Sequence, residues 1–345
     1  MNSNGNSRNA SVAVFGASGH TGRFVVAELA RRGFAPIAIA RDAARLASTA
    51  FAADGVERRQ AAVDDADSLD RALRGAAAVV NCAGPFIDTA DAVASAAIRA
   101  GIHYLDITAE QTSAATTLAR YDAPARAAGV AVVPAMGFYG GLADLLVTTA
   151  LGDWDGADAI DIATGLDRWH PTPGTRATGA RNTAQRLVIA DGRLAPLATR
   201  ASETIWEFPA PIGRQTVIEV PLSEVILIAD HVGTDALRHR LGQVGLADLR
   251  DPSTPPPVAA DDTGRSAQRF AMDAIVRRGG RRRRIVAQGR DIYAFSAPLL
   301  CEAAQRLIAG DFRTAGARAP GALFDAHGFL SALAPRDLTF TLTND

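Results

Sequence analysis

Short apolar runs alternate with longer amphipathic stretches through the first part of the chain. The runs are rich in Val, Ile and Ala, which predicts strands, and in the stretches between them apolar residues recur at helical spacing. This alternation predicts a parallel sheet with helices on both faces, a Rossmann-like doubly wound α/β fold. We expect strands at 12–15, 36–40, 60–63, 77–81, 103–107 and 130–134, and helices at 20–32, 67–73, 90–100 and 111–128, with one more ending near 52.

The pattern changes from about residue 159, where polar and apolar residues alternate along short segments separated by turns. Such segments predict a second, α+β domain with a mostly antiparallel or mixed sheet. Its strands are expected at 160–164, 187–189, 194–197, 205–208, 216–220, 267–277 and 282–288, and its helices at 176–186 and 235–241, followed by a helix at 297–309.

The domain organisation follows from these patterns and from a length of 345 residues, which suits about two domains. We expect a disordered tail at 1–10 and the Rossmann-like domain at 11–150. A domain for substrate binding and dimerisation is expected at 151–295. A C-terminal helix and tail at 296–345 are expected to pack back on the first domain.

The chain contains no lysine, so all 36 of its basic residues are arginines. This absence excludes Schiff-base chemistry on lysine, a phosphate loop ending in lysine, and dehydrogenase mechanisms that pair Tyr or Asp with lysine. The formal net charge is −1, so neither nucleic acid nor an anionic membrane is an expected partner. The one basic cluster, at 277–284, surrounds Gly279-Gly280 and is typical of a hairpin tip.

Targeting and metal signals are also missing from the sequence. No apolar run approaches the roughly 20 residues that span a bilayer, and the first ten residues lack the apolar core of a secretory signal. The six histidines and two cysteines show no metal-ligand spacing. We therefore expect a cytoplasmic protein with no metal.

A glycine-rich turn, GASGHTG at 16–22, lies between the first predicted strand and the first predicted helix. Glycines there permit a tight turn and close approach of a pyrophosphate, and the helix start offers free backbone N–H groups. This context predicts a dinucleotide site. Its expected contacts are Gly16, Ser18, Gly19, His20, Thr21 and Gly22.

The end of the second predicted strand indicates which dinucleotide binds. NAD sites usually carry Asp or Glu there, whereas this chain has Arg41, whose guanidinium suits a 2′-phosphate and favours NADP. A solvated helix start is the alternative reading of Arg41. Asp64 is a candidate contact to adenine, although capping of the next helix explains the acids there equally well. The small turn after the fourth strand is expected near the nicotinamide ribose, with contacts from Asn81, Cys82, Ala83, Gly84 and Pro85.

Four ordered blocks resemble the saccharopine dehydrogenase-like family, which includes saccharopine reductases and trans-acting enoyl reductases. They are GASGHTGR at 16–23, NCAGPF at 81–86, GIHYLD at 101–106 with Glu110, and PAMGF at 134–138 followed by Asp144. The resemblance covers roughly 12–146 and implies an NADP-dependent reductase of C=N or C=C bonds, with Phe138 among the cofactor contacts. Relatives often continue Gly-Phe with Asp-Ser, whereas this chain continues with Tyr139-Gly140-Gly141, so saccharopine itself is a doubtful substrate.

Candidate proton donors stand at the ends of the fifth and sixth strands. Tyr139, on a glycine-flanked loop, is the first choice, followed by Asp106 and Glu110. Helix capping or a solvated first turn are the alternatives for the two acids. The segment 169–174 (WHPTPG) is a candidate wall of the interdomain cleft and adds His170, although it also reads as a rigid turn.

Three classes of function remain open. The first is an NADP-dependent reductase of a small-molecule C=N or C=C substrate, which is the leading hypothesis. The second is a catalytically silent NADP sensor or regulatory protein. In the third, the second sheet forms a dimer and the nucleotide is structural. We expect a homodimer through the second domain.

Overall fold

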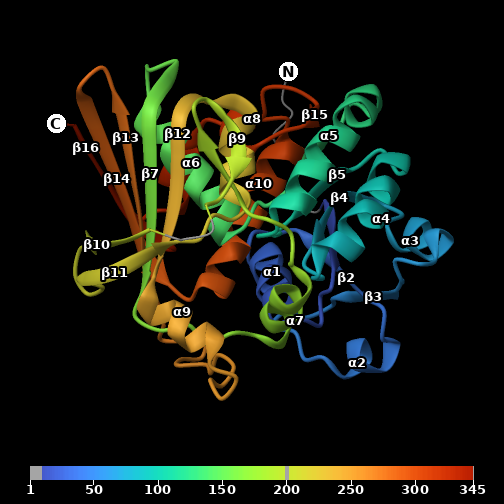
Figure 1. Cartoon of the computed structure of the whole chain (residues 1–345). Coiled ribbons are helices and arrows are strands. Elements are labelled where there is room, and N and C mark those ends of the chain that lie inside the picture. Colours follow the sequence, from blue (N-terminus) through green and yellow to red (C-terminus); the bar gives the residue numbers. More distant parts are fainter. Residues whose placement is uncertain (1–9, 199–201, 345) are drawn as a thin grey trace.

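The computed structural model describes residues 10–198 and 202–344, which form two sheets joined by helices (Figure 1). Sheet A is parallel throughout, with the order β15-β6-β5-β4-β1-β2-β3. The order reverses between β1 and β4, the point at which such sheets bind ligands. Its strands are β1 (Ser11–Phe15), β2 (Ala35–Ala40), β3 (Glu57–Gln60), β4 (Ala76–Asn81), β5 (His103–Asp106), β6 (Ala131–Val133) and β15 (Gly316–Ala317).

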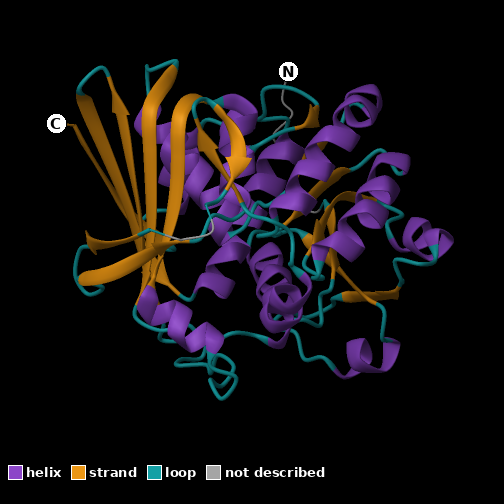
Figure 2. Cartoon of the chain, in the orientation of Figure 1, coloured by secondary structure: helices purple, strands orange, loops and turns teal. Residues whose placement is uncertain are grey.

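Helices cover both faces of sheet A (Figure 2). The crossover helices are α1 (His20–Arg31), α2 (Ala43–Ser48), α3 (Ala66–Ala72), α4 (Phe86–Arg99) and α5 (Gln111–Ala128). The sequence prediction of a Rossmann-like parallel sheet is confirmed.

Sheet B is mixed, because β12 and β7 are parallel whereas the other neighbours are antiparallel. Its main path is β10-β11-β12-β7-β13-β14-β16, and β8 and β9 extend from β12. The predicted second sheet is thereby confirmed. Its strands are β7 (Gly156–Leu166), β8 (Leu187–Ala190), β9 (Arg193–Pro196), β10 (Glu203–Glu207), β11 (Arg214–Glu219), β12 (Gly233–Gly242), β13 (Arg269–Arg278), β14 (Arg281–Arg290) and β16 (Leu338–Asn344).

Helices between the two sheets join them into one structure (Figure 1). Helix α8 contacts α5 and β12, α10 contacts α1 and β14, and α6 packs on β13 and β14. A single cluster of buried apolar residues runs from β1 through α10 into β7 and β13. The other helices are η1 (Phe138–Leu142), α6 (Ala143–Leu151), α7 (Pro173–Arg181), α8 (Ser223–His231), α9 (Gln243–Arg250), α10 (Ile292–Ala309), α11 (Pro320–Leu323) and α12 (Ala326–Leu333).

Two predicted elements differ from the structure. The helix expected at 235–241 is wrong, because this segment is strand β12, where buried Leu237, His239 and Leu241 alternate with more exposed arginines. The third strand ends at Gln60 rather than beginning there. Its sequence, ERRQ, is polar because β3 is an edge strand, so it carries no apolar signal.

The C-terminal segment contributes to both halves of the molecule. Helix α10 lies against α1 and β15 pairs with β6 of sheet A, whereas β16 pairs with β14 of sheet B. Of the segment 296–345, α10 and β15 therefore pack against the first domain, whereas β16 belongs to sheet B. The domain boundaries stay a prediction, and most of the expected tail at 1–10 lies outside the described residues.

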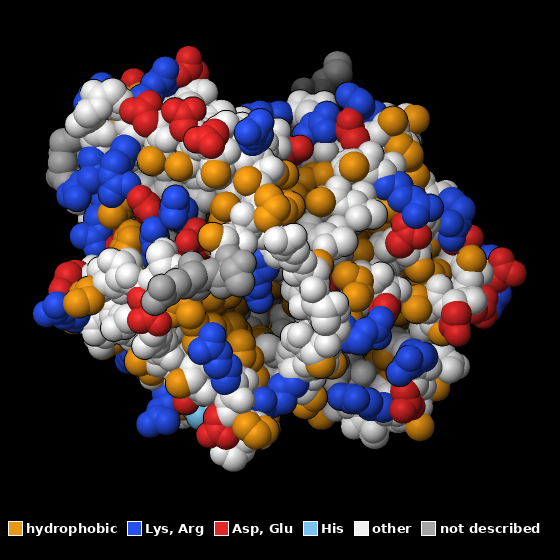
Figure 3. All heavy atoms as spheres, viewed as in Figure 1, with side chains coloured by type: hydrophobic (Ala, Val, Ile, Leu, Met, Phe, Trp, Pro, Cys, Tyr) orange, Lys and Arg blue, Asp and Glu red, His pale blue; other side chains and the backbone are white. Residues whose placement is uncertain are grey.

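The basic cluster at 277–284 lies at the turn of the β13–β14 hairpin, as predicted. Arg277, Arg278 and Arg283 pair with acids that precede or lie on β7, so much of its charge is neutralised within the chain. Basic and acidic side chains are interspersed over the face seen in Figure 3. None of the described helices combines the length and the apolar character needed to cross a bilayer.

Candidate active site

A cavity of about 1260 Å³ lies at the carboxyl ends of the central strands of sheet A, between that sheet and the second half of the chain. It reaches from Arg41 and Arg45 at one end to Tyr139, Arg186 and Leu222 at the other. Cavities for small ligands occupy roughly 300–1000 Å³. This cavity therefore has room for a dinucleotide and a small second molecule.

The glycine-rich turn forms the floor of the cavity near its middle. Gly16 has a φ of +82°, and a Cβ there would lie 2.9 Å from the backbone nitrogen of Ala83, so the turn after β1 lies directly against the turn after β4. A Cβ on Gly22 would lie 2.3 Å from the carbonyl oxygen of Gly16, so Gly22 lets α1 start on top of the turn. Gly16, Ser18, Gly19, His20 and Thr21 line the cavity, whereas Gly22 does not.

The start of α1 has backbone groups that can bind an anion. Its N-cap, Gly19, offers no side-chain cap, which leaves the first backbone N–H groups of the helix for a ligand. Burial lowers the pKa of His20, against Asp291, which raises it, so the ring is neutral at pH 7. Its Nε2 is buried and has no partner among the described residues. These groups fit the pyrophosphate of a dinucleotide.

Arg41 and Arg45 line the outer end of the cavity and are exposed. Among the described residues neither guanidinium has a carboxylate partner. The neighbouring Asp42 is turned toward α2, where its side chain accepts a hydrogen bond of 2.9 Å from the Arg45 backbone nitrogen. Two unpaired arginines here fit the 2′-phosphate of NADP. Asp64, the expected adenine contact, is exposed and outside the lining.

The turn after β4 forms the opposite wall. Asn81 is buried beneath it and accepts a hydrogen bond of 3.0 Å from the backbone nitrogen of Ala83, which shapes the turn from below. Asn81 and Pro85 do not line the cavity, whereas Cys82, Ala83 and Gly84 do. Burial raises the pKa of the Cys82 thiol, which is therefore protonated at neutral pH.

Asp106 is a fully buried acid that lies outside the cavity lining. Its Oδ1 accepts hydrogen bonds from the backbone nitrogens of Thr108 and Ala135, at 2.9 and 2.8 Å, and its Oδ2 accepts one from the Tyr104 hydroxyl at 2.8 Å. Burial raises its pKa. Both oxygens are used in joining β5 to the end of β6, and the catalytic role expected for Asp106 stays a prediction.

Glu110 lies on the same loop and lines the cavity. Its Oε2 accepts hydrogen bonds from the backbone nitrogens of Phe86 and Ile87, at 2.9 and 3.1 Å, and from the Thr108 hydroxyl at 3.2 Å. Its Oε1 is buried without a partner among the described residues. Burial raises the pKa of Glu110, although these hydrogen bonds oppose the rise. One carboxyl oxygen is thus fixed, and the other has no hydrogen-bond partner among the described residues.

Tyr139, on η1, is part of an aromatic wall at the inner end. Its ring centroid lies 5.0 Å from that of Phe138 and 5.6 Å from that of Trp169. The hydroxyl is buried and unpartnered among the described residues. Burial raises the pKa of Tyr139 well above its ordinary value, and Tyr293 and Glu224 add to the rise. The group therefore keeps its proton and is a hydrogen-bond donor rather than a ready acid.

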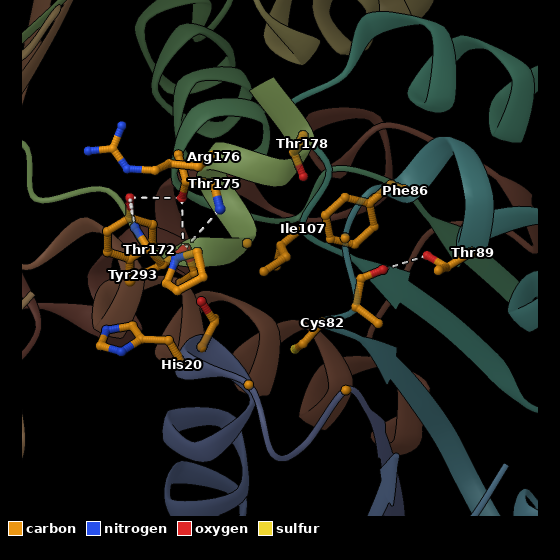
Figure 4. Close-up of a pocket in the computed structure, with 18 of the residues that line it drawn as sticks. His20, Cys82, Phe86, Thr89, Ile107, Thr172, Thr175, Arg176, Thr178 and Tyr293 are labelled. Carbon is orange, nitrogen blue, oxygen red and sulfur yellow. Dashed lines mark hydrogen bonds between the residues drawn. The ribbon is translucent and has the colours of Figure 1, made fainter. Parts of the chain in front are cut away.

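The segment 169–182 closes one side of the cavity. The Tyr293 hydroxyl, on α10, accepts a hydrogen bond of 2.9 Å from Trp169 Nε1 and lies 2.9 Å from the Thr175 hydroxyl. Figure 4 shows Thr172, Thr175 and Tyr293 across the cavity from Cys82, Phe86 and Ile107. His170, predicted here, lies outside the lining, with its Nδ1 3.3 Å from the Pro255 carbonyl.

Sequence reasoning missed several residues at the inner end. They come from distant segments and stand in no recognisable motif, and only the Trp169 segment gave a signal. The missed residues are Arg186, Leu222, Tyr293 and Ser296, together with the lining residues of α7 after Gly174.

Comparisons with known proteins agree with this arrangement. Residues 12–133 match the family model of the saccharopine dehydrogenase NADP binding domain. The structure of apo saccharopine dehydrogenase (L-Glu forming) from Saccharomyces cerevisiae matches over 97% of this chain and 100% of that chain, with a TM-score of 0.68 and 13% identity. At that identity the likeness shows a shared fold.

Other matches are partial. A structure from Burkholderia pseudomallei is 28% identical over 30% of this chain and 49% of its own, with a TM-score of 0.25. A short-chain dehydrogenase/reductase from Veillonella parvula is 16% identical over 30% of this chain and 50% of its own, with a TM-score of 0.27. No curated protein sequence gives a significant match.

Proposed function

We propose that the chain is an NADP-dependent oxidoreductase that reduces the C=N bond of a small imine. The match of residues 12–133 to the saccharopine dehydrogenase NADP binding domain supports the cofactor. The cofactor, when bound, supplies the hydride. Its fit is supported by the uncapped start of α1, the unpartnered His20 Nε2 and the unpaired Arg41 and Arg45.

The free oxygen of Glu110 is the single observation that carries the choice of a C=N bond. In its protonated form Glu110 gives a proton to the imine nitrogen, and the resulting carboxylate pairs with the iminium. Addition of hydride to the carbon then leaves a neutral amine. A carboxyl group whose pKa is raised by burial and whose other oxygen is held by two backbone N–H groups suits both steps.

The aromatic wall orients the substrate. Tyr139 keeps its proton, so its hydroxyl donates a hydrogen bond to the substrate, and Trp169 and Phe138 exclude water beside it. Reduction of a C=C bond would instead need a donor for a polarised carbonyl oxygen, which Tyr139 can supply. The substrate test must therefore include both bond types.

The test combines NADPH binding with turnover. Purified protein is titrated with NADPH and then mixed with a panel of imines and a matched panel of enoyl compounds, while loss of the reduced nicotinamide absorbance is followed. We expect oxidation of NADPH with at least one imine. Preference for enoyl compounds would contradict the C=N assignment. Tight NADPH binding without turnover of either panel would favour the catalytically silent sensor.

A further inference from the structure

Arg186 is an incompletely paired arginine in the wall of the cavity. It is half-buried, and its Nη1 donates one hydrogen bond of 2.9 Å to the carbonyl oxygen of Pro221. Within the described part of the chain no carboxylate lies within 4.0 Å of its guanidinium. Other arginines with little exposed side chain are ion-paired: Arg32 with Glu28 and Glu302, Arg240 with Asp161, Arg283 with Asp153, and Arg306 with Glu302.

The backbone beside Arg186 is tied to the loop that carries Glu110. The Gln111 side chain accepts a hydrogen bond of 2.7 Å from the Leu187 backbone nitrogen and donates one of 2.9 Å to the Leu187 carbonyl oxygen. The residue after Arg186 is therefore locked to the residue after Glu110. Both side chains line the same cavity.

The surroundings of the Arg186 guanidinium compensate its positive charge only weakly. Burial lowers the pKa of Arg186, and the nearby Glu224 opposes this. Glu224 makes no hydrogen bond to it, because Glu224 Oε1 accepts from the Leu222 backbone nitrogen at 2.7 Å and lies 2.7 Å from His239 Nδ1. A partly desolvated guanidinium with free N–H groups binds a carboxylate strongly.

The other arginines of the cavity are placed for different roles. Arg41 and Arg45 stand at the outer end, and Arg23 is exposed on α1. Arg176 donates to the carbonyl oxygens of Leu249 in the last turn of α9 and of Asp251 and Thr254 after it. One guanidinium is thus left for the inner end, which suits a substrate with one carboxylate there.

We propose that Arg186 is the anchor for the carboxylate of a monocarboxylic imino acid, held with its C=N bond toward Glu110. The imine in this statement rests on the proposed function. The carboxylate anchor is separable from it, because its binding can be measured without turnover.

The experiment is calorimetric titration of the protein–NADP⁺ complex with proline, pipecolate and benzoate, each paired with its carboxamide. We compare wild type, Arg186→Gln and Arg186→Lys with Arg193→Gln, an exposed arginine on β9 outside this cavity. At least one carboxylate is expected to bind better than its amide. Arg186→Gln should raise its Kd about ten- to hundredfold, as expected for hydrogen bonds to a charged group.

The controls keep the outcomes distinct. Arg193→Gln should match wild type, Arg186→Lys should fall between wild type and Arg186→Gln, and the Kd of NADPH should be equal in all four proteins, which also shows that the variants fold. The anchor is overturned if no carboxylate outperforms its amide, if Arg186→Gln binds it normally, or if Arg186→Gln weakens NADPH equally. Carboxylate binding that depends on Arg186, together with no turnover of any imine, would reject the proposed reaction and leave the anchor standing.

Discussion

The two ends of the cavity are built in different ways. The nucleotide end is mostly backbone: the turn at 16–22, the start of α1 and the turn at 82–84 lie within one sheet and its crossovers. The inner end is assembled from side chains of distant segments, among them Glu110, Tyr139, Arg186 and Tyr293. The cofactor site therefore depends on local geometry, whereas the proposed substrate site depends on how the second half of the chain packs against the first.

Two buried acids on one loop show the same contrast on a smaller scale. Asp106 and Glu110 are both fully buried, and burial raises the pKa of both. Every oxygen of Asp106 is hydrogen-bonded, whereas Glu110, which lines the cavity, keeps one oxygen without a partner among the described residues. Burial and a raised pKa alone do not separate an acid that stabilises the fold from an acid that can react. The hydrogen-bond partners of each carboxyl oxygen separate them.

The largest effect is expected at the inner end. Glu110→Gln removes the proton donor and the negative charge, so kcat for an imine should fall about 10²- to 10⁴-fold while the Kd of NADPH stays unchanged. Steady-state kinetics and NADPH titration measure the two quantities.

The pH dependence of kcat gives a second test of Glu110→Gln. The protonated form of Glu110 is the donor, so kcat of the wild type should fall as pH rises through the raised pKa of Glu110, and this limb should vanish in Glu110→Gln. Asp106→Asn is the matched control, with normal kcat per folded molecule and unfolding free energy lower by about 1–3 kcal/mol. Equal loss of kcat in Glu110→Gln and Asp106→Asn would contradict the different roles given to the two acids.

An intermediate effect is expected at the nucleotide end. Arg41→Ala removes one of two unpaired guanidinium groups, so the Kd of NADPH should rise about tenfold or more, whereas the Kd of NADH should not change. At saturating NADPH, kcat should equal that of the wild type. Fluorescence titration with both cofactors measures this, and equal losses for NADH and NADPH would remove Arg41 from the 2′-phosphate site.

The smallest effect is expected at Tyr139. Its hydroxyl donates one hydrogen bond and no proton, so Tyr139→Phe should lower kcat/KM for an imine about two- to tenfold. The pH profile of the variant should keep the limb assigned to Glu110. A loss as large as that of Glu110→Gln would make Tyr139 the proton donor, as the sequence alone suggested.

The predictability of the two ends differs for the same physical reason. The first strand, the glycine turn and α1 follow each other along the chain, so predicted bounds of 12–15 and 20–32 agree closely with Ser11–Phe15 and His20–Arg31. Local apolar periodicity and glycine spacing suffice there. NADP binding is likewise readable from adjacent residues, and the family model supports it.

The inner end depends on contacts between residues far apart in sequence. Trp169 meets Tyr293, and Gln111 meets Leu187, through pairings that no local pattern encodes. The sequence predicts a helix for β12 because charged residues separate its apolar positions. The place of β12 inside sheet B shows that its buried and exposed residues alternate as in a strand. Arg186 precedes β8 in a polar stretch without a motif, so its importance comes from burial and from the absence of an acidic partner within the described residues.

A crystal structure of the NADP⁺ complex tests the division of the cavity most directly. The account predicts the 2′-phosphate at Arg41 and Arg45, the pyrophosphate at the start of α1, and the nicotinamide beside Cys82 with its reactive carbon facing the free oxygen of Glu110. A nicotinamide that fills the space between Glu110 and Arg186, or that turns its reactive carbon away from Glu110, would leave no room for the substrate and would contradict the account.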